Sequence, residues 1–449
     1  MNLQRTVMKV NVPELNVPRV VIVGGGFGGI QLAMALKNAA VQVVMFDKNN
    51  YHTFQPLLYQ VATGGLEPDS IAFPLRKMFK RQKNFYFRMA EVAGVDSDKK
   101  IVSTSIGEIG YDYLVLATGS KTNFFGMSDV AHLSHGMKSI PEALDLRSLI
   151  LQNFELAVLA ADLDSRNSLM NFVVVGAGPT GVETAGALAE LKRHILPKDY
   201  PELDLRRMQI HLIEAGDRLL PGMSTEASAN SLEALENMGV QIWMNTRVED
   251  FDGDRVSIAG GKQLDSKTVI WSAGVVGNSP TGLEDAEGRG KRLEVDQFNR
   301  VKGHSNVFAI GDLALMRVED FPAGHPGVAQ VAIQQGQLLA RNIKSLIFQR
   351  ELRPFEYYDK GSMATIGRNK AVVDVKRFRM KGFIAWLMWM LVHLFFLAGF
   401  RNRLVVFTNW FWSYMTYDKG TRLIIRPFKP RKPIPKQKKE EERKPELQV

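Results

Sequence analysis

The sequence predicts an α/β chain with two doubly wound parallel sheets and a helical C-terminal segment. Short runs of Val, Ile and Leu alternate with helical patterns from residue 19 onward, which is typical of parallel strands covered on both faces. A glycine-rich strand–turn–helix pattern occurs twice, with its first glycines 152 residues apart, about the size of one domain. After residue 375 the character changes, because apolar, aromatic and basic residues gather there.

The composition is that of a globular protein of several domains. The chain has 449 residues, of which 45% are hydrophobic and 23% charged. It contains no cysteine, which excludes disulfides, thiolate metal sites, cysteine-ligated clusters, cysteine nucleophiles and any dithiol redox relay. The 8 histidines show no ligand spacing, so we predict no metal site.

The positive charge is concentrated at the C-terminal end. Residues 375–449 contain 17 Lys and Arg but only 5 Asp and Glu, whereas the whole chain carries a net charge of +10. Four of the 6 tryptophans also lie there: Trp386, Trp389, Trp410 and Trp412. Basic residues interleaved with tryptophan suit an anionic membrane surface. Nucleic acid would not require the long apolar run that accompanies them, so we predict no nucleic-acid partner.

The strands are predicted from short apolar runs, and one long helix from its periodicity. The helical pattern at 146–171 ends in a polar run, 164–168, which predicts a turn near the entry to the second domain. The predicted strands are Val20–Val23, Val41–Phe46, Tyr113–Ala117, Phe172–Val175, Ile210–Ile213, Val269–Trp271 and Val307–Ile310.

The first glycine-rich segment, residues 24–29, follows a strand and opens a helix. Gly24, Gly26 and Gly29 have the G-x-G-x-x-G spacing, and Gly28 lies between the last two. The first glycine allows a tight turn, the second a close approach to a pyrophosphate, and the third close helix–strand packing. The helix N-terminus adds partial positive charge. Asp47 ends the next strand, where its carboxylate is placed to accept hydrogen bonds from ribose hydroxyls.

The second glycine-rich segment has the same context. Gly176, Gly178 and Gly181 repeat the spacing, and Glu214 ends the next strand. A carboxylate at this position binds a ribose 2′-hydroxyl and repels a 2′-phosphate, so the site should prefer NADH to NADPH. Arg218 weakens that preference slightly. The fold class predicted is therefore α/β, with two Rossmann-like dinucleotide-binding domains and a C-terminal helical membrane-anchoring segment.

Three further segments resemble those of the two-dinucleotide-binding-domain flavoprotein family. Residues 111–119, ending in Ala117, Thr118 and Gly119, are similar to the segment in which the chain returns to the FAD domain. The segment 269–274, ending in Gly274, resembles the one that leaves the NAD domain. Gly311 and Asp312 follow a strand as in the second flavin motif, which implies that Asp312 lies on the ribityl chain.

Within this superfamily the chain resembles the type II NADH:quinone oxidoreductases most closely. The similarity is carried by residues 47–64, 176–183 and 329–336, and it extends over about residues 18–426. It implies FAD and NADH as cofactors and a membrane quinone, menaquinone or ubiquinone, as electron acceptor. It also implies a homodimer.

The resemblance implies three catalytic residues. Gln330 and Gln334 lie one helical turn apart, so their amides share a face and are expected to bind the quinone carbonyls beside the flavin. Glu183, near the start of the second dinucleotide helix, is expected close to the flavin and nicotinamide as a proton relay or a nicotinamide-ordering group. The alternative is an acid favoured there only by the helix dipole. Tyr51 and His52 are expected to line the site.

The implied reaction passes a hydride from NADH to FAD and then two electrons to the quinone, without proton pumping. The lack of cysteine excludes disulfide reductases and sulfide:quinone reductases of this fold. Two alternatives stay open: an NADH-dependent reductase of a small electron-carrier protein, and a slow-turnover FAD- and NADH-binding protein.

The C-terminal apolar run at 383–400 would form a helix of ~27 Å, just short of the ~30 Å apolar core of a bilayer. Basic residues flank it on both sides, which favours a segment that lies in the interface or dips in and returns. No secretory signal opens the chain. We therefore predict a monotopic protein on the cytoplasmic face of the cell membrane, bound to its lipid surface. A buried core helix is the alternative.

The predicted domains follow from these motifs. Residues 18–145 and 296–375 form the two parts of the FAD-binding domain, and residues 146–295 form the NADH-binding domain. Residues 376–426 form the membrane-anchoring segment. The Pro-, Lys- and Glu-rich residues 427–449 are predicted to be a disordered basic tail.

Overall fold

A computed structural model describes residues 8–418, 420–429 and 431 and divides the chain into two compact units. Unit 1 comprises Met1–Thr53, Ala72–Lys121 and Val275–Lys360. Unit 2 comprises Phe54–Ile71, Thr122–Gly274 and Gly361–Val449. The chain thus changes unit at residues 122, 275 and 361, whereas the predicted domains change at 146, 296 and 376. The chain also changes unit at residues 54 and 72.

Unit 1 is built on a five-stranded parallel sheet with the strand order β20-β9-β1-β2-β5. The register pairs Val20 with Val43 across β1 and β2, and Val21 with Leu114 across β1 and β9. These strands confirm the four runs predicted for this unit, and β5 was not predicted. The bounds are β1 Arg19–Val23, β2 Gln42–Asp47, β5 Phe85–Met89, β9 Tyr113–Leu116 and β20 Val307–Ala309.

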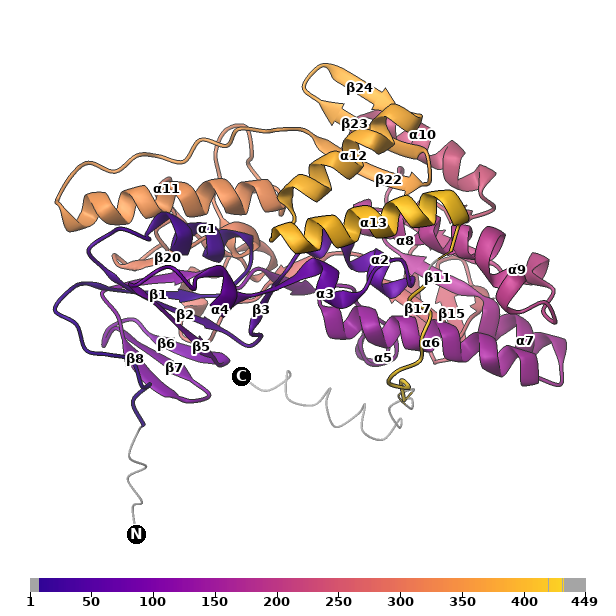
Figure 1. The fold of residues 1–449 in the computed structure, drawn as a ribbon, viewed down its shortest axis with the longest axis horizontal. Helices are drawn as coiled ribbons and strands as arrows, with labels where there is room; N and C mark the ends of the chain where they lie inside the picture. Colours follow the sequence, from indigo (N-terminus) through magenta and orange to yellow (C-terminus); the bar gives the residue numbers. More distant parts are fainter. Residues whose placement is uncertain (1–7, 419, 430, 432–449) are drawn as a thin grey trace, which may run out of the picture. The chain divides into compact units, whose positions relative to one another are not determined.

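Alternate residues of each central strand face opposite sides of this sheet. Val20 and Ile22 pack toward helices α1 (Phe27–Ala35) and α11 (Ala329–Ile347), which lie side by side (Figure 1). Val21 and Val23 pack toward an antiparallel layer on the other side, formed by β6 (Val92–Asp96), β7 (Ile101–Thr104) and β8 (Gly107–Gly110). Burial on both faces explains why these strands are continuously apolar.

Unit 2 contains a second parallel sheet, with the strand order β13-β12-β11-β17. Helix α8 (Pro179–Glu190) follows β11 and continues into a π-helical turn, Leu191–Ile195, and α9 (Leu196–Asp199). The three predicted strands of this unit are confirmed, and β13 was not predicted. The bounds are β11 Phe172–Val175, β12 Ile210–Ile213, β13 Gln241–Trp243 and β17 Thr268–Trp271.

Further layers complete unit 2. An antiparallel sheet of β14 (Val248–Phe251), β15 (Arg255–Ile258) and β16 (Lys262–Asp265) shares an apolar core with the parallel sheet. A second antiparallel sheet joins β22 (Ser362–Gly367), β23 (Lys370–Val375) and β24 (Phe378–Lys381), and β22 packs on α8. Unit 2 also contains the helices α2 Leu58–Ala62, α3 Pro68–Ile71, α5 Ser128–Leu133 and α10 Thr225–Asn237.

The helical pattern at 146–171 forms two helices, and its predicted polar turn is wrong. Helix α6 spans Ile140–Leu159 and begins at Ser139 with a capping box that includes Glu142. Helix α7 spans Leu163–Met170 and includes all of the polar run. The side chain of Asp162 accepts a hydrogen bond from Ser165 N (2.7 Å), so a polar residue caps this helix where we expected a turn.

The apolar run at 383–400 and the residues that follow it form a helical hairpin. Helix α12 spans Gly382–Phe396, and α13 spans Phe400–Thr416 after a break at Gly399, whose φ is +86°. The two helices lie side by side (Figure 1). Trp389 of α12 is fully buried. Within the described part of the chain, no helix combines the length and apolar character needed to cross a membrane.

Part of the segment predicted to be a disordered tail packs on unit 2. Gln152 of α6 exchanges two hydrogen bonds with the backbone of Phe428, at 2.7 and 3.1 Å. The Phe428 ring lies 4.9 Å from His135, and Arg426 forms an ion pair with Asp145. A single aromatic side chain and a backbone contact thus order a stretch whose composition is otherwise polar. Residues 430 and 432–449 lie outside the described residues.

Candidate functional site

The glycine loop of unit 1 is tightly enclosed on one side and open on the other. Gly24 has a φ of +108°, and a Cβ there would lie 2.3 Å from the carbonyl oxygen of Ala117. A Cβ at Gly29 would lie 2.0 Å from Gly24 O. At Gly26, by contrast, a Cβ would meet no atom closer than 4.0 Å. The first and third glycines are therefore required by packing, whereas the space over the second is free for a ligand.

The carboxylate of Asp47 closes this loop from behind. It accepts hydrogen bonds from Gly25 N (2.6 Å) and Asn49 N (2.7 Å). Burial raises the pKa of Asp47, and the two backbone hydrogen bonds oppose that shift. Because a carboxylate has about four acceptor positions, it can bind these amides and ribose hydroxyls together. His52 lies alongside, with Nδ1 3.0 Å from Gly25 O, and burial lowers its pKa to about 4.

The second flavin motif of unit 1 is held by residues that the sequence analysis missed. Ser120 donates a hydrogen bond to Asp312 (2.7 Å), and the buried amide of Gln335 accepts one from Gly311 N (2.7 Å). A Cβ at Gly336 would lie 2.5 Å from Gly28 O, so this glycine allows α11 to approach α1. The adjacency of Gln335 and Gly336 to the predicted quinone-site glutamines was the signal available in the sequence.

Residues 117–119 of unit 1 form another part of the predicted FAD site. Ala117 N donates to Val23 O (2.7 Å), and the hydroxyl of Thr118 donates to Asn278 O (2.6 Å). Gly119 has a φ of +69° and no atom within 4 Å of a Cβ. These residues therefore border open space, as a cofactor-binding loop requires.

The glycine loop of unit 2 repeats the geometry of the first. Gly176 has a φ of +94°, and a Cβ at Gly181 would lie 1.8 Å from Gly176 O. A Cβ at Gly178 would meet no atom within 4 Å. The carboxylate of Glu214 accepts hydrogen bonds from Ala177 N (2.7 Å) and Gly216 N (2.8 Å), in the same way that Asp47 binds its loop.

Two other residues were singled out from the sequence for the second nucleotide site, Gly274 and Arg218, and both contact residues of unit 2. Gly274 has a φ of +70°, and a Cβ there would lie 2.6 Å from the ring of Phe125. Arg218 donates to Pro221 O (2.7 Å). The residues of both units therefore fit dinucleotides: each loop leaves space over its second glycine, at the N-terminus of a helix, with a carboxylate at the next strand end.

Gln330 and Gln334 bind a neighbouring backbone segment of unit 1. Gln334 exchanges two hydrogen bonds with Tyr358, from Tyr358 N (3.0 Å) and to Tyr358 O (2.9 Å). Gln330 accepts a hydrogen bond from Lys360 N (3.0 Å). The two amides lie on one side of α11, as expected from their spacing, and they anchor the stretch that leads out of the unit.

Glu183 is a buried residue and not a solvated helix-start acid. It is the fifth residue of α8, beyond the first turn, and it is 8% exposed. Thr365 N of β22 approaches its carboxyl oxygen at 3.5 Å. Burial raises the pKa of Glu183 to about 8, against the opposing influence of the Thr365 amide and the Trp389 indole. The side chain is therefore mostly protonated at neutral pH.

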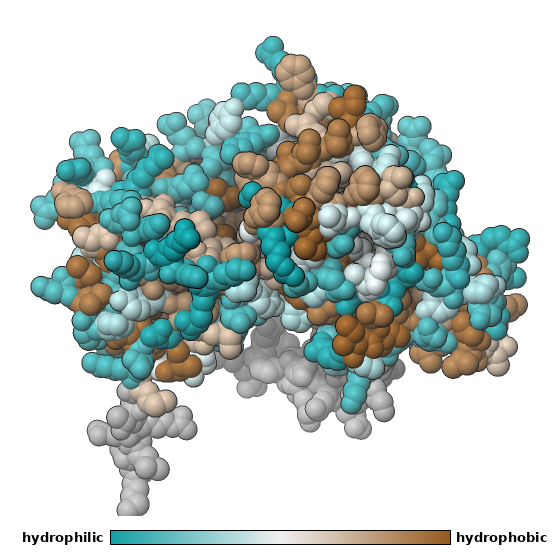
Figure 2. All heavy atoms as spheres, viewed as in Figure 1, coloured by the Kyte–Doolittle hydropathy of each residue, from teal (hydrophilic) through white to brown (hydrophobic). Residues whose placement is uncertain are grey.

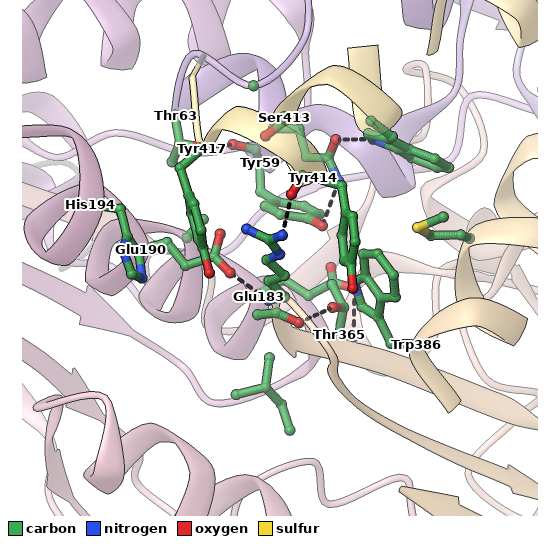
Figure 3. Close-up of a pocket in the computed structure, with 18 of the residues that line it drawn as sticks. Tyr59, Thr63, Glu183, Glu190, His194, Thr365, Trp386, Ser413, Tyr414 and Tyr417 are labelled. Carbon is green, nitrogen blue, oxygen red and sulfur yellow. Dashed lines mark hydrogen bonds between the residues drawn. The ribbon is translucent and has the colours of Figure 1, made fainter. Parts of the chain in front are cut away.

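Glu183 lies at a pocket of unit 2 with an aromatic lining (Figure 3). The pocket encloses about 850 Å³ when its open mouth is counted. Figure 3 shows Tyr59, Trp386, Tyr414 and Tyr417 around it, together with Glu183, Glu190 and His194. The guanidinium of Arg368 lies between two rings, 4.0 Å from that of Tyr414 and 3.9 Å from that of Tyr417. Sequence reasoning missed this pocket because its residues come from five separate segments.

Comparisons with known proteins agree with this geometry. Residues 18–336 match the family model described as pyridine nucleotide-disulphide oxidoreductase, and residues 359–416 match the one described as NDH2 C-terminal domain. A type II NADH:quinone oxidoreductase of Mycobacterium tuberculosis, Ndh, is 37% identical over 90% of both chains. The chain belongs to the type II NADH:quinone oxidoreductase family.

Other relatives are consistent with this membership. The type II NADH:quinone oxidoreductase of Staphylococcus aureus is 30% identical over 79% of this chain and 89% of its own. A solved structure of NDH2 from Plasmodium falciparum in complex with NADH shares the fold, with a TM-score of 0.84 and 21% identity, over 92% of this chain and all of that one.

Family membership confirms the expected enzyme class and cofactors. The chain is an FAD-dependent oxidoreductase that catalyses the reaction in the family's name, the oxidation of NADH by a quinone. Because it has no cysteine, it carries out this reaction without the dithiol relay after which the pyridine nucleotide-disulphide family is named.

Proposed function

We propose that unit 1 holds FAD and unit 2 holds NADH, and that Glu183 supplies a proton to the quinone. The proposal rests on the twofold occurrence of one arrangement: a glycine loop, open over its second glycine and backed by a carboxylate at the next strand end. FAD, when bound, supplies the two-electron chemistry that joins hydride transfer from NADH to quinone reduction. The protein residues bind and orient FAD, NADH and the quinone, and supply a proton to the quinone.

In each unit, a carboxylate is proposed to bind the ribose of the nucleotide. In unit 2, Glu214 accepts hydrogen bonds from ribose hydroxyls and repels a 2′-phosphate, so we assign NADH to this loop. Asp47 has the corresponding role toward the ribose of FAD, and Asp312, oriented by Ser120, binds the ribityl chain. Gln334 Nε2 donates one hydrogen to Tyr358 O, and its second hydrogen is proposed to bind a quinone carbonyl. Gln330 is proposed to act beside it.

Glu183 is proposed as the proton donor. Reduction of a quinone to a quinol takes two electrons and two protons, and NADH delivers two electrons with one proton. One further proton per turnover must therefore come from water through the protein. A carboxyl group that is protonated at neutral pH and lines an aromatic pocket is suited to give it.

We further propose that α12 and α13 bind the cytoplasmic face of the cell membrane without crossing it. Ile384, Leu387, Leu391 and Phe395 form an exposed stripe on α12 at helical spacing. Phe400, Leu404, Phe407, Phe411 and Met415 form a second on α13. Figure 2 shows apolar side chains gathered over these helices. Exposed Arg377, Arg379, Lys381 and Arg401 suit anionic headgroups.

Anaerobic stopped-flow absorbance tests the proposed reaction. NADH is expected to bleach the flavin band rapidly, NADPH much more slowly, and a short-chain quinone to restore the band. If NADH bleached the flavin band and quinone did not restore it, the electron acceptor would be a protein. The same assay with menaquinone and ubiquinone analogues identifies the preferred quinone. The homodimer stays a prediction, which light scattering in detergent checks.

A further inference from the structure

One face of α8 and the π-helical turn after it carries three titratable side chains into the pocket. Glu183, Glu190 and His194 all line it, and Ala187 lies between the two glutamates. The spacing of these four positions, 183, 187, 190 and 194, is that of a single helical stripe. Figure 3 shows the three labelled side chains along one side of the pocket, with His194 beside Tyr417.

The three groups run from the interior toward solvent. Glu183 is buried, whereas Glu190 and His194 are partly exposed. The His194 ring stacks on Tyr417, with centroids 4.1 Å apart, which fixes its position at the outer end. Ala187, whose side chain is small, also lines the pocket. π-helical turns frequently mark functional sites, and this one aligns His194 with the glutamates.

The other polar side chains around the pocket are of different chemical types. Arg368 is a permanent cation whose backbone N donates to Glu190, and Nη2 of its guanidinium donates to Tyr414 O. Burial raises the pKa of Tyr59 well above its usual value. Thr63, Thr365 and Ser413 carry hydroxyls and Gln60 an amide, and the remaining polar side chains of the lining belong to tryptophans and tyrosines. The three α8 groups are therefore the ones suited to transfer protons among the described lining residues.

A buried proton donor needs a path for its own reprotonation. After Glu183 gives up its proton, the resulting carboxylate is left in a poorly solvated environment and must regain a proton before the next turnover. The pocket is roomy, open to solvent and partly polar, so it can hold water between the side chains.

We propose that Glu190 and His194 relay protons from solvent, through water in the pocket, to Glu183. The inference rests on the proposed role of Glu183 in quinone reduction. In each turnover the O–H bond of Glu183 breaks as an O–H bond forms on the quinone oxygen. His194, which has taken a proton from solvent, passes it through water to the Glu190 carboxylate, and Glu190 passes it on to the Glu183 carboxylate. His194 is then neutral and takes the next proton from solvent. No electrons pass through the relay.

Rapid-reaction kinetics of the full-length, FAD-loaded protein test the relay. Glu190→Gln and His194→Gln keep size and polarity but remove proton exchange. We expect bleaching by NADH to keep its rate in both variants, and steady-state kcat with a short-chain quinone to fall about tenfold at an unchanged quinone KM. Imidazole added to the buffer should restore the rate of the His194→Gln variant. Glu236→Gln, which changes an exposed acid of α10, is the matched control and should behave as wild type.

A second variant tests the water path independently of the acids. Ala187→Leu places a larger apolar side chain on the pocket wall, at the helix position between the two glutamates, and should slow quinone reduction by a similar factor, without rescue by imidazole. FAD content and Tm verify that each variant is folded.

The outcomes separate the relay from the function on which it rests. If Glu183→Gln is slow while Glu190→Gln, His194→Gln and Ala187→Leu keep the wild-type rate, the relay is overturned and the role of Glu183 stands. If Glu183→Gln also keeps the wild-type rate, the proposed role of Glu183 fails. Slower bleaching by NADH in the relay variants, or loss of rate that imidazole does not restore in His194→Gln, would indicate a structural effect and overturn the relay.

Discussion

At the residue scale, Glu214 determines which nicotinamide coenzyme the second loop accepts. Its carboxylate is fixed by two backbone amides, Ala177 N and Gly216 N, so it cannot turn away from a 2′-phosphate without losing both bonds. We expect Glu214→Ala to raise the ratio of kcat/KM for NADPH to that for NADH by about tenfold or more, mainly through weaker NADH binding. Asp47→Ala is the control: it should lower FAD content and leave that ratio unchanged. A ratio that does not move in Glu214→Ala would contradict the assignment.

The buried carboxyl of Glu183 makes stability depend on pH. Its folded-state pKa of about 8 lies above its ordinary value of 4.5, so the folded protein holds this proton where the unfolded chain has lost it. Its contribution therefore favours folding fully below pH 4.5 and is lost as the pH rises toward 8. We expect Glu183→Gln to raise Tm relative to wild type, by more at pH 8 than at pH 5. Thermal unfolding at several pH values checks this, and a pH-independent difference would refute it.

Some of the residues that build the site could be predicted from the sequence and others could not. The spacing of the glycines and the acid at each strand end specify local geometry, and these could be predicted. The roles of Ser120 and Gln335 could not, because each binds a partner far along the chain and an isolated hydroxyl or amide carries no periodic signal. The same reason applies to Gln334, whose contact with Tyr358 is a tertiary one.

At the scale of elements, the close approach of α1 and α11 supports the flavin side of unit 1. A Cβ at Gly336 would lie 2.5 Å from Gly28 O, which is rigid backbone at the start of α1. We expect Gly336→Ala to push the helices apart, cost about 1–3 kcal/mol in the free energy of unfolding, and lower FAD content. Urea unfolding and flavin absorbance measure the two effects. Gly222→Ala, at a glycine with no atom within 4 Å of a Cβ, should change neither; equal effects of both substitutions would count against close packing as the cause.

The elements that could be predicted are those whose pattern is set by burial. All seven predicted strands are present, because a strand buried on both faces must be continuously apolar. The polar run at 164–168 was misjudged because the exposed face of a short capped helix has the composition of a turn. The apolar run at 383–400 extends beyond the end of α12 at Phe396, because apolar composition continues to the start of α13 after Gly399, whose φ is positive.

At the scale of the whole molecule, the chain passes repeatedly between its two compact units. Residues 54–71 belong to unit 2 although the chain on both sides belongs to unit 1. Composition shifts mark boundaries along the chain, but unit membership follows tertiary contacts, such as those of α2 with α6 and α8. This is why motif order predicted two nucleotide-binding units but placed their boundaries at different residues.

The exposed apolar stripes of α12 and α13 are predicted to bind lipid. Deleting the hairpin would remove buried Trp389 and uncover β23, on which α12 packs, so point substitutions are the cleaner test. We expect the combined change of Phe400, Phe407 and Phe411 to Ser to abolish sedimentation with anionic lipid vesicles, because it removes three exposed aromatic side chains from one helix face. Turnover with a short-chain, water-soluble quinone should be retained, whereas turnover with a long-chain quinone in vesicles should fall.

The matched control changes exposed leucines elsewhere in unit 2. Leu156, Leu159 and Leu163, on α6 and α7, are as exposed as the three phenylalanines but lie outside the hairpin. Their joint replacement by Ser should leave vesicle binding intact, since they are neither part of the two stripes nor near the basic residues 376–381. If both triple variants still bind vesicles, another surface binds the lipid. If both lose binding, general surface hydrophobicity is responsible and not the helical hairpin.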